Sequence, residues 1–444
     1  MALRLPRGVV RWTEDAWAYL AYDAEMWQAF EGGQIWGGLT DFTGMHPPLW
    51  HLLHSFLEWA APIPMLLIGT SLIFSIGAAW IASRLGWMVG LLVATSPLQL
   101  AYAAELNNYP AYALCAAWLW WSHQQAQSDG KSHHLVIATA VGVWVHLLLG
   151  AIGLLLAASL SRTVFFRVTR WLSFALLPLL PGLLELFQSG QAMSQPPFKP
   201  TLVASEYAGR FGLLSLFLLV PAWKGLRSSP HLAKAFLSVV TLILGLQVAG
   251  FAAPHQFPYW LALSVPFALL VQRGATTPLL RILVWSIAAL QAISIARLNM
   301  SQVAEMGEDL QRTRGIDIAL QEAQPGDGIY LLRKRMLPDD DKRGFSSQLA
   351  RISPWNSLPR TRPYNFPYVD HRHGQPRDLN GVAVYVNDNP REVIQEAIAA
   401  HGTLFLVVSG HHGNRRFAAE LTQWVHAEPE EIGEDSLYRL QSGN

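Results

Sequence analysis

Residues 135–159 read LVIATAVGVWVHLLLGAIGLLLAAS, and His146 is the one ionisable side chain in this run. A helix needs about 20 apolar residues to cross the ~30 Å hydrocarbon core of a membrane. The run is therefore long enough for one spanning helix, or for two half-length helices that reverse between His146 and Gly150. Either arrangement predicts a helical protein that lies in a membrane.

Similar apolar runs recur from residue 49 to residue 297. The clearer ones lie at 61–82, 86–104, 109–122, 135–159, 171–188, 211–223, 233–253, 258–272 and 278–297. Several are shorter than a full span, so we expect tilted or broken helices inside a larger bundle. The predicted fold class is mainly α: a polytopic transmembrane helical bundle followed by a small α/β domain.

The overall composition agrees with a membrane protein. Hydrophobic residues make up 51% and charged residues 14% of the 444 residues, whereas about 25% of the residues in a soluble globular protein are charged. The net charge of +1 gives no support for a nucleic-acid partner. Cys115 is the only cysteine, which excludes an intrachain disulfide and a cysteine-based metal site. The opening stretch MALRLPRGVVRW lacks the features of a cleavable signal peptide.

Basic residues predict the orientation of the bundle, because cytoplasmic loops collect Lys and Arg. A single span at 135–159 would separate Arg162 and its neighbours from Arg84. If the chain instead reverses near His146, ten basic residues share one face: Arg84, Lys131, Arg162, Arg167, Arg170, Lys224, Arg227, Lys234, Arg273 and Arg281. We prefer the reversal, with the shared face in the cytoplasm of a bacterium and the bundle in its inner (plasma) membrane.

The reversal also predicts which parts of the chain lie outside the cell membrane. These are the loops 13–48, 101–109, 189–210 and 254–260, together with the C-terminal domain. The N-terminus then lies outside as well. We therefore expect that a first helix is missing, or that the true start of the chain lies upstream.

Three regions follow from these patterns. They are an N-terminal segment with an acidic first external loop (1–48), a multi-span transmembrane domain (49–299) and a soluble α/β domain (300–444). In the last region, strands are predicted at 328–334, 382–386, 403–408 and 436–441, and helices at 300–323, 391–400 and 414–426. The polar, Pro- and Arg-rich segment 336–380 is either a surface loop or a lid over a membrane site.

The first external loop and the helix after it concentrate acidic residues. These are Glu14, Asp15, Asp23, Glu25, Glu31, Asp41 and Glu58. Carboxylates are costly at membrane depth and are often functional there, but a solvated loop bears them freely. Glu14 and Asp15 also suit the start of a loop helix. The acidic residues of this loop are therefore either catalytic or simply solvent-exposed surface residues.

Three ordered stretches carry a family resemblance: EDAWAYLAYDAEMWQAFEGG (14–33), HPPLWHLL (46–53) and SPLQLAYAAELNNYPAYAL (96–114). Together with His146, they resemble the GT-C glycosyltransferases of the family 39 type, which include protein O-mannosyltransferases and aminoarabinose transferases. Relatives often carry an arginine where Asn107 and Asn108 follow Glu105. They often show Arg-Tyr in a late helix, where this chain has His255, Gln256 and Tyr259.

The resemblance implies an enzyme of the cell envelope. It would transfer a sugar, with inversion, from a polyprenyl-phosphate carrier to a glycan, lipid or protein acceptor at the outer membrane face. A carboxylate would remove the acceptor proton, with Asp15 as the first candidate, Asp23 as the second and Glu14 beside them. The predicted donor- and acceptor-binding residues are Glu25, His46, Glu105, Asn107, Asn108, Tyr109, His146, Arg210 and His255.

No metal is assigned to this chain from its sequence. A divalent cation held by Asp15 or Glu14 with Glu105 is an alternative, because hard cations take carboxylate oxygens. His46, His51 and His54 resemble a zinc cluster, but only His51 and His54 share a helix face.

Two alternative functions, from other classes of protein, remain open. A transporter for a lipid-linked glycan would place charged residues along a pathway inside the spans and would show internal repeats. A non-catalytic relative would bind a glycolipid or act as a scaffold, which fits the missing arginine near Asn107.

Overall fold

The computed structural model describes Gly33 and residues 47–60, 64–103, 107–188, 213–249, 257–294, 315–332, 377–379, 381–387, 390–408, 422, 427–432 and 435–441. The chain divides into two compact units, one built of helices and one built around a sheet. Each is described by itself.

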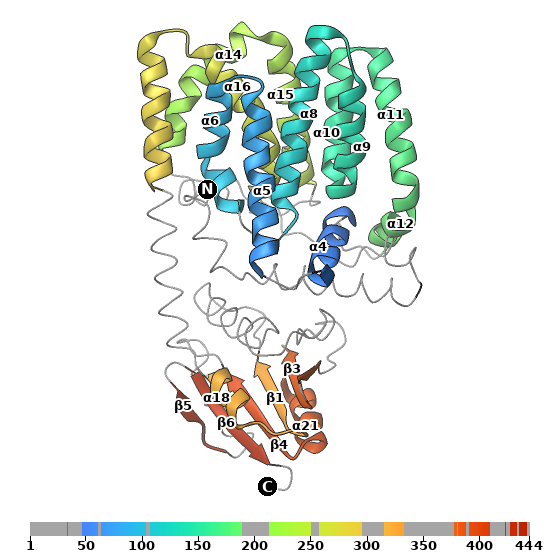
Figure 1. Cartoon of the computed structure of the whole chain (residues 1–444), viewed down its shortest axis with the longest axis vertical. Coiled ribbons are helices and arrows are strands. Elements are labelled where there is room, and N and C mark those ends of the chain that lie inside the picture. The colour runs from blue at the N-terminus through green and yellow to red at the C-terminus, as the bar shows by residue number, and fades with distance from the viewer. Residues whose placement is uncertain are drawn as a thin grey trace. The chain divides into compact units, whose positions relative to one another are not determined.

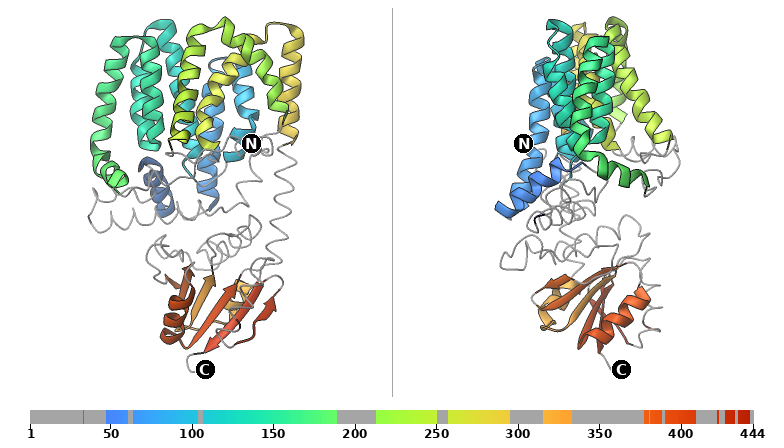
Figure 2. Two further views of the ribbon diagram at one scale, coloured as in Figure 1. Left: turned by 180° about the vertical axis from the view of Figure 1, so that it is seen from behind. Right: turned by 90° about the vertical axis from the view of Figure 1, so that its right-hand side faces the viewer.

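The first described helices of the chain are α4 (Leu49–Ala60), α5 (Pro64–Ser83), α6 (Trp87–Thr95), α7 (Pro97–Tyr102), α8 (Tyr109–Asp129), α9 (His133–Val145) and α10 (Leu147–Leu160). They are followed by α11 (Arg162–Leu176), η1 (Leu177–Leu179), α12 (Leu180–Gln188), η3 (Leu213–Leu218), α14 (Leu219–Ser228), α15 (Pro230–Val248), η4 (Phe257–Leu263) and α16 (Ser264–Gly274). Residues 49–54 of α4 belong to the helical unit, and residues 55–60 are grouped with the second unit. A further apolar helix covers Pro278–Ser294. The long helices run side by side (Figure 2).

The surface of the helical unit is apolar. Helices α5, α6, α9 and α10 carry apolar residues on every side, a pattern typical of helices buried in a protein core or in lipid. Large apolar side chains nevertheless point outward, such as Ile73, Val248 and Leu279, which are 67%, 67% and 76% exposed. By length and composition, the described helices Arg162–Leu184 and Pro230–Val248 are long and apolar enough to cross a membrane. An outward-facing apolar surface of this extent suits lipid rather than water.

The chain reverses at His146, as the preferred interpretation of residues 135–159 predicts. A Cβ atom added to Gly142 would lie 3.1 Å from Leu149 Cβ, and one added to Gly150 would lie 3.1 Å from Val143 Cγ2. These pairs, on either side of His146, show that α9 and α10 pack as an antiparallel hairpin. A single continuous span through these residues is therefore wrong. The extended backbone of His146 (φ −161°, ψ 127°) separates the two helices.

The ten basic residues predicted to share one face lie at one end of the helical unit, which we call the basic end. Arg273 Nη2 donates to Gln124 Oε1 at 2.9 Å, which joins the ends of α16 and α8. Arg167 Nη1 donates to Ser132 Oγ at 2.9 Å, which joins α11 to the start of α9. Figure 1 shows that neighbouring helices alternate in direction. The remaining basic residues lie at helix ends or within three turns of them, so they fall toward this same end.

Aromatic rings accompany the cations at the basic end. Guanidinium groups lie over rings in three pairs: Arg84 over Trp80 at 4.5 Å, Arg162 over Phe166 at 5.5 Å and Arg227 over Trp223 at 5.0 Å. Trp87 and Trp285 stack with ring centroids 4.5 Å apart. Tryptophan and arginine are both favoured where a membrane meets water, and a cation over an aromatic face is itself attractive. The basic end therefore has the composition of a membrane–water boundary.

The second unit contains a six-stranded mixed sheet in the order β2-β3-β1-β4-β6-β5. The strands are β1 (Gly328–Leu332), β2 (Arg377–Leu379), β3 (Val382–Asn387), β4 (Thr403–Val408), β5 (Glu430–Ile432) and β6 (Asp435–Gln441). The central strands β3, β1 and β4 are parallel, and the outer strands pair antiparallel. All four predicted strands are present, whereas the short strands β2 and β5 are not predicted from the sequence.

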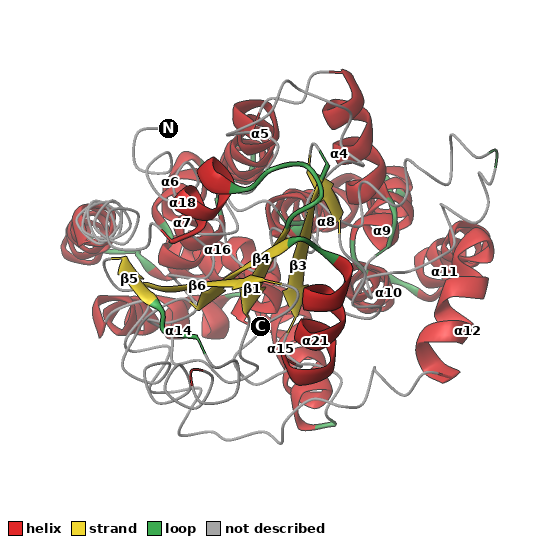
Figure 3. Cartoon of the chain, turned by 90° about the horizontal axis from the view of Figure 1, so that it is seen from below, coloured by secondary structure: helices red, strands yellow, loops and turns green. Residues whose placement is uncertain are grey.

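Of the described helices in this part of the chain, α21 and α18 lie on opposite faces of the sheet (Figure 3). From α21 (Pro390–Ala400), Ile394 joins the core that contains Tyr330 and Leu406. On the other face, the first residue of α18 (Gly315–Glu322), Gly315, lies against Val407 and donates its N–H to Asp435 Oδ2 at 2.7 Å. The predicted helix 391–400 is thus confirmed. Of the predicted helix 300–323, residues 300–314 lie outside the described residues, as do most of 414–426 and nearly all of the segment 336–380.

An ion-pair network ties α18 to β6 and gives a testable result. Arg439 donates to both carboxylate oxygens of Glu322, at 2.7 and 2.9 Å, and to Glu430 at 2.5 Å. The hydrogen bond from Arg439 holds the pKa of the Glu322 carboxyl below its ordinary value of 4.5. A carboxyl group whose pKa is lowered by folding stabilises the folded state at pH values above its ordinary pKa. This stability is lost as the pH falls through the pKa of the folded state.

We therefore expect Arg439→Met to weaken the α18–β6 attachment by about 1 kcal/mol at pH 7, since the pair is partly exposed. Hydrogen exchange of the β6 amides in the full-length protein measures the effect. The difference measured at pH 7 should shrink at a pH well below 4.5, once the pH has fallen through the lowered pKa of Glu322 and its carboxyl is protonated. An equal difference at both pH values would mean that the ion pair is not its cause.

Candidate functional site

Four of the predicted binding residues lie within the described residues: Asn107, Asn108, Tyr109 and His146. They meet at the end of the helical unit opposite the basic end, where α8 begins and α9 ends. The 3₁₀ helix η4 packs along α8: Tyr112 Oη, near the start of α8, donates to Tyr259 O at 3.0 Å, and Trp120 Nε1, in its middle, donates to Ala262 O at 2.8 Å. Segments that lie far apart in the sequence are thereby brought together.

The two asparagines are buried and hold the frame of this cluster. Asn108 is fully buried and its Nδ2 donates to Val145 O at 3.1 Å. This carbonyl lies in the last turn of α9, where helices leave carbonyl groups without helical partners. Asn107 Oδ1 accepts from Tyr109 N at 3.1 Å, at the start of α8. The same residue type therefore acts as a donor at position 108 and as an acceptor at position 107.

This contrast predicts losses of different size for the same substitution at neighbouring positions. Asn108→Asp replaces the donor with an acceptor that faces Val145 O, and we expect it to cost about 2–3 kcal/mol, the range for an unmet buried polar group. Asn107→Asp keeps the acceptor for Tyr109 N and places a negative charge at a helix start, which is favourable. Because Asn107 is buried, desolvation of the new carboxylate opposes this gain, so we expect a loss of stability that is smaller than that of Asn108→Asp. Thermal unfolding of the detergent-solubilised protein compares the two. Equal losses would mean that these hydrogen bonds are not the cause.

His146 caps α10 with its side chain. Its Nδ1 accepts a hydrogen bond from Leu148 N at 3.2 Å. When one ring nitrogen of a neutral histidine accepts, the other carries the proton. Nε2 is therefore the donor of the neutral ring, and a phosphate or sugar oxygen is a suitable acceptor for it.

Two tyrosines surround the His146 ring. Its centroid lies 4.9 Å from that of Tyr112 and 5.2 Å from that of Tyr259, both in edge-on geometry. Tyr112 Oη donates to Tyr259 O at 3.0 Å, which ties α8 to η4. In the sequence, Tyr259 lies where relatives often show Arg-Tyr. The structure adds that both tyrosines contact the predicted residue His146.

Gln247, in the last turn of α15, was missed from the sequence. Its side chain is fully buried, and within the described residues neither of its amide atoms has a hydrogen-bond partner. The buried indole N–H of Trp260, in η4, also has no hydrogen-bond partner among the described residues. Helix α15 packs against α10 and η4, and Gln247 lies at the end of α15 away from the basic end. Buried polar groups of this kind are typical of sites that bind water or a polar ligand. The sequence does mark this residue, because Gln247 is the one amide side chain in the apolar run 233–253.

Eight predicted site residues lie outside the described residues: Glu14, Asp15, Asp23, Glu25, His46, Glu105, Arg210 and His255. Their roles stay predictions, as does the alternative divalent cation on Glu14 or Asp15 with Glu105. His51 and His54 are buried on α4, and the His54 ring lies 4.0 Å from that of Trp50. Among the residues that the structure describes, no three His, Cys, Asp or Glu side chains are grouped closely enough to hold a metal ion.

The helical unit is thus an apolar bundle with a polar cluster at one end, and the second unit is a mixed α/β domain. No protein-family model and no curated protein match the sequence. Two crystal structures of ArnT from Cupriavidus metallidurans do match the fold. Each alignment covers 99% of this chain and 96% of ArnT. The apo structure gives a TM-score of 0.60 at 12% identity, and the structure bound to undecaprenyl phosphate gives 0.61 at 13%.

ArnT is an aminoarabinose transferase of the GT-C superfamily. The likeness extends over nearly the whole length of both proteins, so this chain has the GT-C fold that the motif resemblance implies. At these identities, the comparison shows the fold and leaves the reaction to be argued from the residues.

Proposed function

We propose that this protein is a membrane glycosyltransferase that moves a sugar from a polyprenyl-phosphate carrier to an acceptor. The supporting observation is the fold, shared over nearly its full length with an ArnT structure that is bound to undecaprenyl phosphate. The polar cluster around His146 adds support, because it gathers two buried asparagines, a histidine and two tyrosines at one end of the bundle.

In the proposed reaction, a hydroxyl oxygen of the acceptor attacks the anomeric carbon of the sugar while the bond to the carrier phosphate breaks. The Asp15 carboxylate takes the hydroxyl proton, with Asp23 as the second candidate, and the configuration at the anomeric carbon inverts. The phosphate leaves with its negative charge and is stabilised by hydrogen-bond donors and cations rather than by an acid. His146 Nε2–H, Gln247 and Arg210 supply such groups in this proposal.

The proposed orientation places the basic end in the cytoplasm and the His146 cluster toward the outside of a bacterial inner membrane. The rule that positively charged loops stay inside supports this choice. The C-terminal α/β unit is then extracytoplasmic, where it would help to select the acceptor.

The proposal is tested with the purified full-length protein and a panel of polyprenyl-phosphate sugars. We expect protein-dependent release of polyprenyl phosphate together with transfer of the sugar. Reconstitution in liposomes separates transfer from transport, because a transporter would move the intact donor across the membrane and release no carrier. Intact donor in every reaction, with no protection of the protein by undecaprenyl phosphate in thermal unfolding, would reject the proposal.

A further inference from the structure

A groove opens on the helical unit near the basic end, away from the His146 cluster. Leu155 of α10 and Leu226 of α14 form two sides, and α15 contributes Pro230, Ala233, Lys234, Leu237, Ser238 and Thr241. Its volume is about 730 Å³, and sites for small organic ligands commonly have roughly 300–1,000 Å³. Ala233, Ser238 and Thr241 are small residues, which leaves the space between the leucines open.

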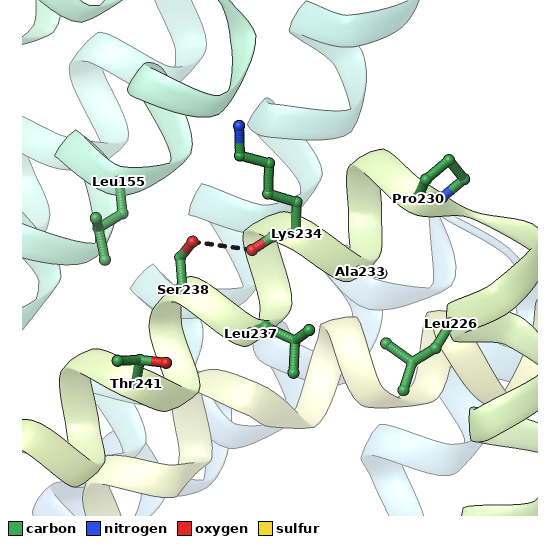
Figure 4. Close-up of a pocket in the computed structure, with 8 residues that line it drawn as sticks. All are labelled: Leu155, Leu226, Pro230, Ala233, Lys234, Leu237, Ser238 and Thr241. Atoms are coloured by element: carbon green, nitrogen blue, oxygen red, sulfur yellow. Dashed lines mark hydrogen bonds between the residues drawn. The ribbon is translucent and has the colours of Figure 1, made fainter.

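Lys234 supplies the one charge in the groove lining. Figure 4 shows its side chain extended, with the ammonium group pointing away from Leu237 and Thr241. Ser238 Oγ donates to Lys234 O at 2.9 Å, so this hydroxyl is engaged with the helix backbone. The groove thus combines apolar walls with a cation toward the start of α15.

The end of the helical unit that contains Lys234 is strongly positive. Ten Lys and Arg residues lie at the basic end, and Asp129 is the one acidic residue among the described residues there. Next to Leu226 in the sequence, Arg227 lies over the Trp223 ring at 5.0 Å, and the Trp223 side chain is exposed. Such a pair is typical of the level at which lipid headgroups meet the hydrocarbon core. Lys234 therefore lies near headgroup level, and the apolar walls extend into the bilayer from it.

We propose that this groove binds one anionic phospholipid from the leaflet at the basic end. The phosphate pairs with the Lys234 ammonium, and an acyl chain lies along Leu155, Leu237 and Thr241. The occupant is an anionic lipid because the site offers a cation within a positive field, which favours a negative headgroup over a zwitterionic one. A free phosphate would gain nothing from the apolar walls. The proposal does not depend on the reaction proposed above.

The test is thermal unfolding of the full-length protein in neutral detergent, titrated with phosphatidylglycerol. We expect phosphatidylglycerol to raise the unfolding temperature, and phosphatidylcholine and inorganic phosphate to have little effect. In Lys234→Gln, the lipid concentration needed for the half-maximal rise should increase about tenfold or more, as expected for loss of a hydrogen bond to a charged group. Lys131→Gln is the matched control, because it removes the same charge from the same end outside the groove.

A second variant, Ala233→Phe, keeps Lys234 and fills the groove. Native mass spectrometry should then show that one retained phosphatidylglycerol is lost in both Ala233→Phe and Lys234→Gln, and is kept in Lys131→Gln. The unfolding temperatures without added lipid show whether each variant is folded. Equal lipid effects in Lys234→Gln and Lys131→Gln, or equal responses to phosphatidylglycerol and phosphatidylcholine, would overturn the proposal.

Discussion

Asp15→Asn should lower the rate of carrier release by about 10²- to 10⁴-fold, the usual contribution of a positioned general base. The amide has nearly the same size as the carboxylate but cannot accept the acceptor proton at neutral pH. Donor binding should be little changed, so the loss is expected in kcat rather than in KM. The acidic limb of the pH–rate profile should disappear in the variant, because the group that titrates there has been removed. Initial rates of polyprenyl-phosphate release at saturating donor measure the effect.

Three further variants make this result specific. Asp23→Asn tests the second candidate, and the variant with the larger loss of kcat identifies the base. Glu105→Gln should also lower turnover, because Glu105 is predicted to contact the donor. Asp41→Asn is the control, since it makes the same chemical change in the same loop at a residue with no predicted role. Unchanged turnover in Asp15→Asn, Asp23→Asn and Glu105→Gln would reject this site.

The sequence predicts helices well where apolar residues are continuous, and poorly where the helix boundaries depend on polar residues. The predicted span 86–104 is broken at Ser96 (φ −57°, ψ 128°), because a proline disfavours the helical conformation in the residue before it. The predicted span 109–122 continues instead to Asp129 as α8, where Gly130 caps the helix with φ 72°. Polar residues in the last two turns hide this continuation from a hydropathy pattern. The helix predicted at 171–188 begins earlier, at Arg162. The arginines in its first turns hide this start from a hydropathy pattern.

The candidate site shows a different limit of prediction. His146 was identified from one motif and Asn107 and Asn108 from another, but neither motif shows that Asn108 bonds to the residue before His146. That contact arises because α8 and α9 are packed antiparallel, which brings the start of one beside the end of the other. Tyr259 and Gln247 reach the same end of the bundle from η4 and α15. Their roles depend on helix packing, which no local pattern records.

The second large effect concerns folding, and it arises where two of the described helices, α14 and α16, pack very closely. Helices α14 and α16 cross with backbone against backbone at two glycines, Gly225 and Gly274. A Cβ atom at Gly225 would meet the carbonyl oxygen of Leu270, and one at Gly274 would meet that of Pro221, both well inside van der Waals contact. Small residues at such crossings are how membrane helices approach closely. Because the obstacles are backbone atoms, no side-chain rotation relieves them.

We therefore expect Gly225→Ala to destabilise the bundle by about 3 kcal/mol or more, at the upper end for overpacked sites, since the helices themselves must separate. Gly274→Ala should behave alike. Gly245→Ala is the matched control: Gly245 lies in the neighbouring helix α15 and has no atom within 4 Å of an added Cβ, so alanine should be neutral or mildly stabilising through its helix propensity. Size-exclusion profiles and unfolding temperatures in detergent compare the three variants. If Gly225→Ala remained monodisperse with the unfolding temperature of Gly245→Ala, the close approach of α14 and α16 would be wrong.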